Sequence, residues 1–94
     1  MPSSTDQVGP TVRLLYFAWV REKLGRAEET LALPMDLKTV ADVMAWLSRR
    51  GPEFSDVFSR PGIIRAALDQ AHVQPSAQVA GAREIAFFPP VTGG

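Results

Sequence analysis

The chain has 94 residues, ten basic and ten acidic side chains, and no cysteine. Its length predicts a single domain, and its zero net charge argues against nucleic acid and against an acidic membrane surface as partners. Without cysteine it has no disulfide framework, no thiolate metal site and no cysteine nucleophile.

The N-terminal segment, residues 1–10 (MPSSTDQVGP), is polar and contains proline and glycine. That composition offers little apolar surface to bury, and it predicts a disordered leader. The segment also lacks the basic stretch and apolar run of a secretory signal. No apolar run in the chain approaches the ~20 residues of a membrane-spanning helix, so we expect a cytoplasmic protein without a membrane partner.

Residues 12–18 (VRLLYFA) predict the first strand, which should lie inside the sheet because both of its faces are largely apolar. Side chains alternate between the two faces of a strand. The inner set is then Val12, Leu14 and Tyr16, and the outer set is Arg13, Leu15 and Phe17. A helical turn closed by Gly25 should follow. Residues 28–33 (EETLAL) alternate in the same way and predict the second strand of a hairpin, with Leu31 and Leu33 facing inward and Pro34 ending it.

Residues 39–50 predict the main helix. Thr39, with Asp42 three positions later, resembles a capping box. Two arginines in the last turn suit the negative end of the helix dipole, and Gly51 can close the helix. We expect Trp46, at the edge of the apolar stripe, to be half exposed. The stripe consists of Val40, Val43, Met44 and Leu47.

Residues 52–60 (PEFSDVFSR) predict a loop or short helical turn that tucks its two phenylalanines under the sheet edge. Residues 63–68 (IIRAAL) predict a third strand, and residues 69–73 a turn followed by a short return strand. His72 in that return strand is the single histidine of the chain, and it lacks the second ligand cluster that a metal site needs. It is therefore predicted to be a surface residue. Residues 75–83 form a turn-rich connection to the last strand.

The chain ends with an apolar strand at residues 85–88 (IAFF), then Pro89 and Pro90, then residues 91–94 (VTGG). Proline stops a strand because it has no N–H for the ladder, and the pair favours stiff polyproline geometry. Six extended residues span about 20 Å, and glycine has no Cβ, so this tip can enter a narrow channel. The terminal carboxylate of Gly94 is the predicted working group.

This end of the chain, AFFPPVTGG at residues 86–94, resembles the C-terminal signature of the small subunit of molybdopterin synthase, also called molybdopterin converting factor subunit 1. The family consists of ubiquitin-like sulfur carriers. Residues 12–18 and the following Arg21-Glu22 and Gly25 resemble the family's first strand and its R-E-x-x-G turn. The resemblance covers about residues 11–94. The chain departs from the family at residues 69–70, Asp-Gln instead of Asn-Gln, and at residues 81–84, GARE instead of an acidic Gly-Asp-Glu run.

The order of the predicted elements fits an α+β domain, and the resemblance implies a ubiquitin-like β-grasp, a mixed sheet with one main helix packed on one face. The domain would span residues 11–88 and the extended tail residues 89–94. The first and last strands should lie side by side in the middle of the sheet. Parity then places Ile85 and Phe87 against the helix and Phe88 on the open face. We expect a partner-docking surface there, formed by Phe88, Phe17 and Leu15 with Arg21 at its rim.

The resemblance also implies a mechanism in which this chain is a non-catalytic sulfur donor that binds no cofactor and no metal. An adenylating, E1-like enzyme would use ATP and magnesium to convert Gly94 to an acyl-adenylate, and a persulfide would convert it to a thiocarboxylate. The tail would then enter the active site of the large synthase subunit in a heterotetramer and give sulfur to cyclic pyranopterin monophosphate. The inserted residues would be Pro89, Pro90, Val91, Thr92 and Gly93.

Two other functions share the same activation chemistry. The chain could be another β-grasp sulfur carrier, for thiamine or for tRNA thiolation, although the residues FFPP before the two glycines argue against the thiamine type. It could also be a ubiquitin-like modifier that forms isopeptide bonds through Gly94. Intact mass separates these classes, because a carrier gains one sulfur in place of oxygen and a modifier forms lysine-linked adducts.

Overall fold

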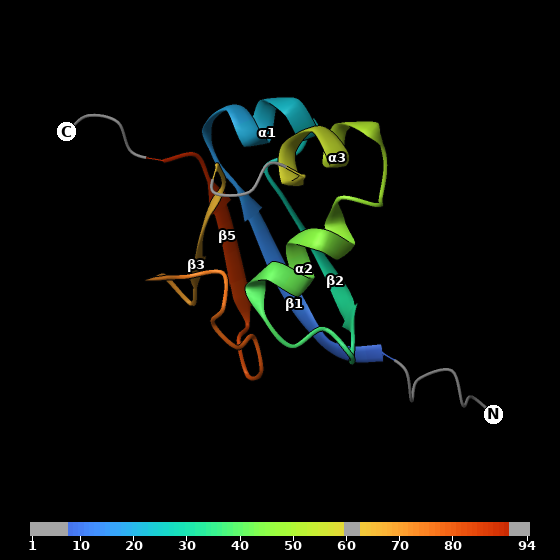
Figure 1. The fold of residues 1–94 in the computed structure, drawn as a ribbon, viewed down its shortest axis with the longest axis vertical. Helices are drawn as coiled ribbons and strands as arrows, with labels where there is room; N and C mark the ends of the chain where they lie inside the picture. The colour runs from blue at the N-terminus through green and yellow to red at the C-terminus, as the bar shows by residue number, and fades with distance from the viewer. Residues whose placement is uncertain (1–7, 60–62, 91–94) are drawn as a thin grey trace.

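The structure is a computed structural model that describes residues 8–59 and 63–90. In chain order its elements are β1 (Val8–Tyr16), α1 (Ala18–Leu24), β2 (Glu28–Pro34), α2 (Val40–Leu47), α3 (Pro52–Phe58), β3 (Arg65–Leu68), β4 (Ala71–Val73) and β5 (Glu84–Phe88). The strands form one sheet in the order β2-β1-β5-β3-β4 (Figure 1). β1 and β5 run parallel, and the other neighbouring pairs run antiparallel. The predicted α+β class and the central pairing of first and last strands are confirmed.

Helices α1, α2 and α3 cover one face of the sheet (Figure 1). Their buried side chains form one apolar cluster with the inward side chains of the strands. The helical members are Val20, Leu24, Val40, Val43, Leu47, Phe54, Val57 and Phe58, and the strand members include Val12, Leu14, Tyr16, Leu33, Ile85 and Phe87. The main helix predicted over residues 39–50 corresponds to α2, and α1 and α3 lie where the sequence predicted a helical turn closed by Gly25 and a loop or short helical turn over residues 52–60. None of the three is long and apolar enough to span a membrane.

β1 begins earlier than the sequence predicted. Val8 already pairs with Pro34 of β2, so the disordered leader expected over residues 1–10 is wrong for its last three residues. The composition of this segment could not show the pairing, because ladder hydrogen bonds use main-chain groups. The register shifts between Val8 and Thr11, which accommodates Pro10 and its missing N–H. Residues 1–7 lie outside the described part of the chain.

The start of α2 agrees with the sequence prediction, whereas its end does not. The capping box is confirmed, because the Thr39 side chain accepts from the Asp42 N–H and the Asp42 carboxylate accepts from the Thr39 N–H. The helix nevertheless ends at Leu47 instead of residue 50. Gly51 does not close it, but precedes α3, whose first residue is Pro52. Proline suits this position because the first N–H of a helix has no partner within the helix.

The β3–β4 hairpin explains two further differences. β3 begins at Arg65 instead of residue 63, and β4 begins at Ala71, which the prediction placed in the turn. Asp69 and Gln70 form the turn with φ values of 48° and 75°. Two consecutive residues in the left-handed backbone conformation give a turn whose twist matches that of the flanking strands of a tight hairpin. The turn is therefore two residues long, and it leaves Ala71 free to pair with Leu68.

Candidate functional site

The chain leaves the sheet after Phe88, where β5 ends, and Pro89 and Pro90 follow in no regular structure. Just before this point the N–H of Phe17 donates to the carbonyl oxygen of Phe87 over 3.1 Å, which fixes the end of β5 against β1. The prolines then stop the ladder, as predicted. Val91, Thr92, Gly93 and Gly94 lie outside the described residues, so their roles stay predictions.

The sheet face opposite the helices has two small side chains at its centre. In register across four strands, His72 lies opposite Ala67, Ala67 opposite Ala86, and Ala86 opposite Leu15. Alanine side chains are short, so Ala67 and Ala86 form the floor of a hollow of about 340 Å³. Its walls are three apolar side chains, Leu15, Phe17 and Phe88, and three polar ones, Gln70, His72 and Glu84.

The structure thus brings together three of the four residues predicted to form a docking surface. Leu15, Phe17 and Phe88 lie around one hollow on the face that no helix covers, and Phe17 is 48% exposed. Strand parity predicted this arrangement correctly. Arg21, predicted at the rim, lies exposed in α1 and is not among the residues that line the hollow. The docking role itself stays a prediction.

The polar side of the hollow is built by the β3–β4 hairpin and the start of β5. The ring of His72 lies 5.1 Å from that of Phe88, measured between centroids, with a tilt of 46°. Asp69 Oδ1 accepts the N–H groups of Arg83 and Glu84 over 3.0 and 3.1 Å, which ties the hairpin turn to β5. His72 is exposed, as predicted, but the sequence did not indicate its contact with Phe88.

An aromatic cluster lies beneath this face, on the inner side of the sheet. The ring of Phe87 stacks on Tyr16, with centroids 6.2 Å apart, and meets the edge of Phe58 at 5.0 Å. Tyr16 and Phe87 are almost fully buried. Since Phe87 precedes the last residue of β5, this packing holds the strand from which the tail departs.

A polar network secures Tyr16 from the other side. Its hydroxyl donates to Glu29 Oε2 over 2.7 Å, and Arg50 donates to both oxygens of Glu29 over 2.7 and 3.1 Å. Arg26 donates to Glu29 Oε1 over 3.1 Å. Arg50 also lies over the ring of Phe54 at 4.6 Å. The network joins β1, β2 and the α2–α3 connection, and no motif in the sequence indicated it.

The network shifts two pKa values. Burial, followed by the hydrogen bond to Glu29, raises the pKa of Tyr16 well above its usual range, so the phenol stays a neutral donor. Partial burial alone would raise the pKa of Glu29. The hydrogen bonds from Arg50 and Tyr16, with the charges of Arg50 and Arg26, outweigh that effect and lower the pKa below its ordinary value.

The polar side chains that line the hollow include one histidine, His72, and one carboxylate, Glu84. In the part of the chain that the structure describes, no three His, Asp or Glu side chains gather as a metal site. The residues that line the hollow offer apolar contacts and hydrogen-bonding groups next to the point where the chain leaves the sheet after Phe88.

Comparison with known proteins gives a consistent set of relatives. A family model, described as the ThiS family, matches residues 14–94. The chain is 32% identical over 83 residues to the molybdopterin synthase sulfur carrier subunit of Haemophilus influenzae, covering 88% of this chain and 99% of that protein. It is 31% identical to the protein of the same name from Escherichia coli, with the same coverage.

Solved structures resemble this chain in fold. The small archaeal modifier protein 1 of Methanosarcina acetivorans matches with a TM-score of 0.65 and 22% identity, covering 93% of this chain and 98% of that one. SAMP1 from Haloferax volcanii matches with a TM-score of 0.65 and 24% identity, covering 90% of this chain and 100% of that one. At this level of identity the likeness shows the fold alone, and it confirms the predicted β-grasp.

Proposed function

This chain belongs to the ThiS family, and we propose that it acts as the sulfur carrier subunit of molybdopterin synthase. The observation that carries the proposal is the match to two relatives with that name over nearly their whole length. The C-terminal sequence FFPPVTGG supports it, because the family match extends through residue 94.

The chemistry begins at the terminal carboxylate, which is ionised at neutral pH and is a poor electrophile. In our proposal an E1-like enzyme binds ATP and magnesium, and a Gly94 oxygen attacks the α-phosphorus while pyrophosphate leaves. A persulfide sulfur then attacks the carbonyl carbon and AMP leaves. Cleavage of the sulfur–sulfur bond by a thiol gives the thiocarboxylate, which is both nucleophilic and transferable.

The charged carrier would then deliver its sulfur inside the large synthase subunit. The thiocarboxylate attacks cyclic pyranopterin monophosphate there, and two carriers supply the two sulfurs of the dithiolene. Pro89 and Pro90 would stiffen the start of the tail and reduce the entropy lost on insertion. General acid and base chemistry belongs to the partner in this proposal.

The uncovered face is the proposed contact with the large subunit. Leu15, Phe17 and Phe88 present apolar surface beside the exit of the tail, so docking on this face would direct the tail into the partner. The alanine floor would receive an apolar side chain of the partner. Glu84, Gln70 and His72 would supply the polar rim that such interfaces have.

A change at the last residue tests the proposal. Deletion of Gly94, or addition of residues after it, should abolish sulfur transfer and leave the unfolding transition unchanged, since the members of the core cluster come from residues 12–87. The same residues added before Met1 serve as the control and should leave transfer intact. An untrimmed C-terminal extension that still transfers sulfur would refute the assignment.

A further inference from the structure

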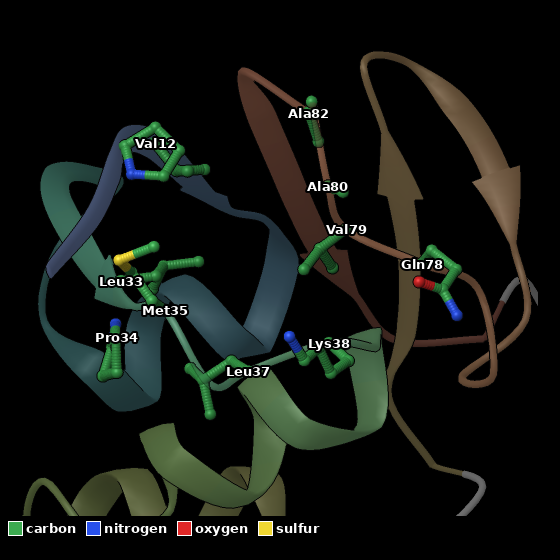
Figure 2. A pocket seen from close by; sticks show the side chains of 12 residues that line it. Val12, Leu33, Pro34, Met35, Leu37, Lys38, Gln78, Val79, Ala80 and Ala82 are labelled. Carbon is green, nitrogen blue, oxygen red and sulfur yellow. The ribbon is translucent and has the colours of Figure 1, made fainter. Parts of the chain in front are cut away.

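A second pocket, of about 230 Å³, is lined by residues of the start of β1, the end of β2 and the segment before β5. Figure 1 shows the starts of β1 and β5 at the end of the sheet opposite to the end of β5. Figure 2 shows the apolar side chains of the pocket facing one another across the opening. The apolar walls include Val12, Leu33, Met35, Leu37, Val79 and Ala82. Since Val12 and Leu33 belong to the buried core, the pocket is an opening into that core.

Main-chain hydrogen bonds hold the walls of this pocket in place. The N–H of Val79 donates to the carbonyl of Lys38 over 2.9 Å, and the N–H of Ala82 donates to the carbonyl of Val79 over 3.0 Å. On the opposite wall the N–H of Leu37 donates to the carbonyl of Pro34 over 3.3 Å. These bonds order the backbone on both sides of the opening. The pocket is therefore preformed, which reduces the entropy that a ligand would have to overcome.

Two polar side chains line the pocket, Lys38 and Gln78. In Figure 2 the amine of Lys38 turns toward the apolar side chains, whereas the amide of Gln78 turns away from them. Within the described residues the Lys38 side chain makes no hydrogen bond or ion pair. The other lysine of the chain, Lys23, instead forms an ion pair with Asp56 at 2.8 Å. The Lys38 ammonium is thus available to an anion.

We propose that this pocket binds a small amphiphilic carboxylate, with its apolar chain between Leu33, Leu37 and Val79 and its carboxylate on the Lys38 ammonium. The size of the ligand follows from the volume. A dry apolar cavity of about 150 Å³ accepts benzene, so 230 Å³ accommodates roughly eight to ten non-hydrogen atoms. One cation suits a single negative charge, and a polyphosphate would find no second cation among the lining residues.

A ligand in this pocket would leave the end of β5 and the hollow on the uncovered face accessible to a partner. The pocket is lined by residues that precede β5, whereas the tail follows the last residue of that strand, and no residue of the pocket lines the hollow on the uncovered face. A ligand that binds only the folded chain stabilises it by mass action. Occupancy should therefore raise the unfolding temperature without blocking the tail.

Octanoate, added as its sodium salt, is the probe, and the anion has about ten non-hydrogen atoms, as the volume requires. Titration of the full chain, followed by amide chemical shifts in nuclear magnetic resonance, should give saturable changes at Leu37, Lys38, Val79 and Ala82. Amides around the hollow, such as those of Ala67 and Ala86, should not move. The absence of any shift, or shifts that spread over both faces without saturating, would overturn the proposal.

Three variants separate the charge from the cavity. Lys38→Met should weaken octanoate binding roughly fivefold, as expected for one partly exposed ion pair, and leave binding of uncharged octan-1-ol unchanged. Lys23→Met, which removes the other lysine, is the matched control and should change neither. Ala82→Leu, which fills the pocket, should abolish binding of both ligands. Equal octanoate affinity in the two lysine variants, or unchanged binding in Ala82→Leu, would contradict the assignment.

Discussion

Two adjacent phenylalanines in β5 have opposite surroundings. Phe87 is 0% exposed and packs between the rings of Tyr16 and Phe58. Phe88 faces the other side of the sheet and lines the hollow with Phe17. Because successive side chains of a strand point to opposite faces, a single step along the chain separates a core residue from a surface residue.

This difference predicts different consequences for two alanine variants. Phe88→Ala should weaken binding to the large subunit by about 2 kcal/mol or more, and reduce the free energy of unfolding by only about 1 kcal/mol. Phe87→Ala, the matched core variant, should reduce the free energy of unfolding by about 3–5 kcal/mol. Calorimetric titration and urea unfolding measure the two quantities. If Phe88→Ala lost stability as Phe87→Ala does, the surface role of Phe88 would be wrong.

The lowered pKa of Glu29 predicts that acid reduces the free energy of unfolding. The pKa of this residue is lowered in the folded chain from the ordinary value of 4.5, so its contribution to stability is present above about that pH and is lost as the pH falls through the lower, folded value. Glu29→Gln should reduce the free energy of unfolding at neutral pH by about 1–3 kcal/mol. Below pH 4.5 the free energy of unfolding of this variant should fall less steeply with pH than that of the wild-type chain.

Unfolding in urea at a series of pH values measures this dependence. Glu22→Gln is the control, because Glu22 lies exposed in α1. It should change the free energy of unfolding at neutral pH by no more than about 0.5 kcal/mol. An acid profile of Glu29→Gln that follows the wild type would show that the network with Arg50 and Tyr16 does not set the acid stability.

At the scale of elements, the β3–β4 hairpin carries a strained turn. Gln70 has a φ of 75°, a conformation that disfavours residues with a Cβ, and its two-residue turn sets the position of β4 beside the hollow. Gln70→Gly should therefore raise the free energy of unfolding by about 0.5–1 kcal/mol. Ala71→Gly, one residue later in β4 with an ordinary φ, should lower it. Thermal unfolding of the two variants checks the sign, and a destabilised Gln70→Gly would show that the turn is unstrained.

The elements also show which parts of the structure the sequence could predict. Strand parity is local, so the inward and outward sets of β1 and β5 and the cluster of Leu15, Phe17 and Phe88 followed from residue types alone. The capping box at Thr39 and the glycine cap at Gly25 were equally local, and both are present.

The incorrect predictions depended on distant contacts or on unusual conformations. The end of α2 was misplaced. The N–H groups of Arg49 and Arg50 donate to carbonyls three positions back instead of four, and the Arg50 side chain pairs with Glu29, which is 21 positions away. Ala18 begins α1 with a φ of 56°, which alanine rarely adopts and which no pattern indicates. The pocket beside Lys38 arises where three segments that are distant in sequence meet, so it required the structure.

At the scale of the whole molecule, the sheet separates three functions that we assign to this chain. One face carries the helices (Figure 1) and the core, and the lining of the proposed docking hollow belongs to the other face. The tail leaves one end of β5, and the Lys38 pocket lies at the other. The proposed docking face and the Lys38 pocket therefore involve different residues of the sheet and its connections.

The most direct test is the intact mass of the full chain after incubation with its adenylating enzyme, ATP, magnesium and a persulfide donor. We predict the exchange of one oxygen for one sulfur, located at Gly94 by fragmentation, and its loss when the charged chain meets the large subunit and cyclic pyranopterin monophosphate. An unchanged mass, or lysine-linked adducts in place of the exchange, would contradict the assignment as a sulfur carrier.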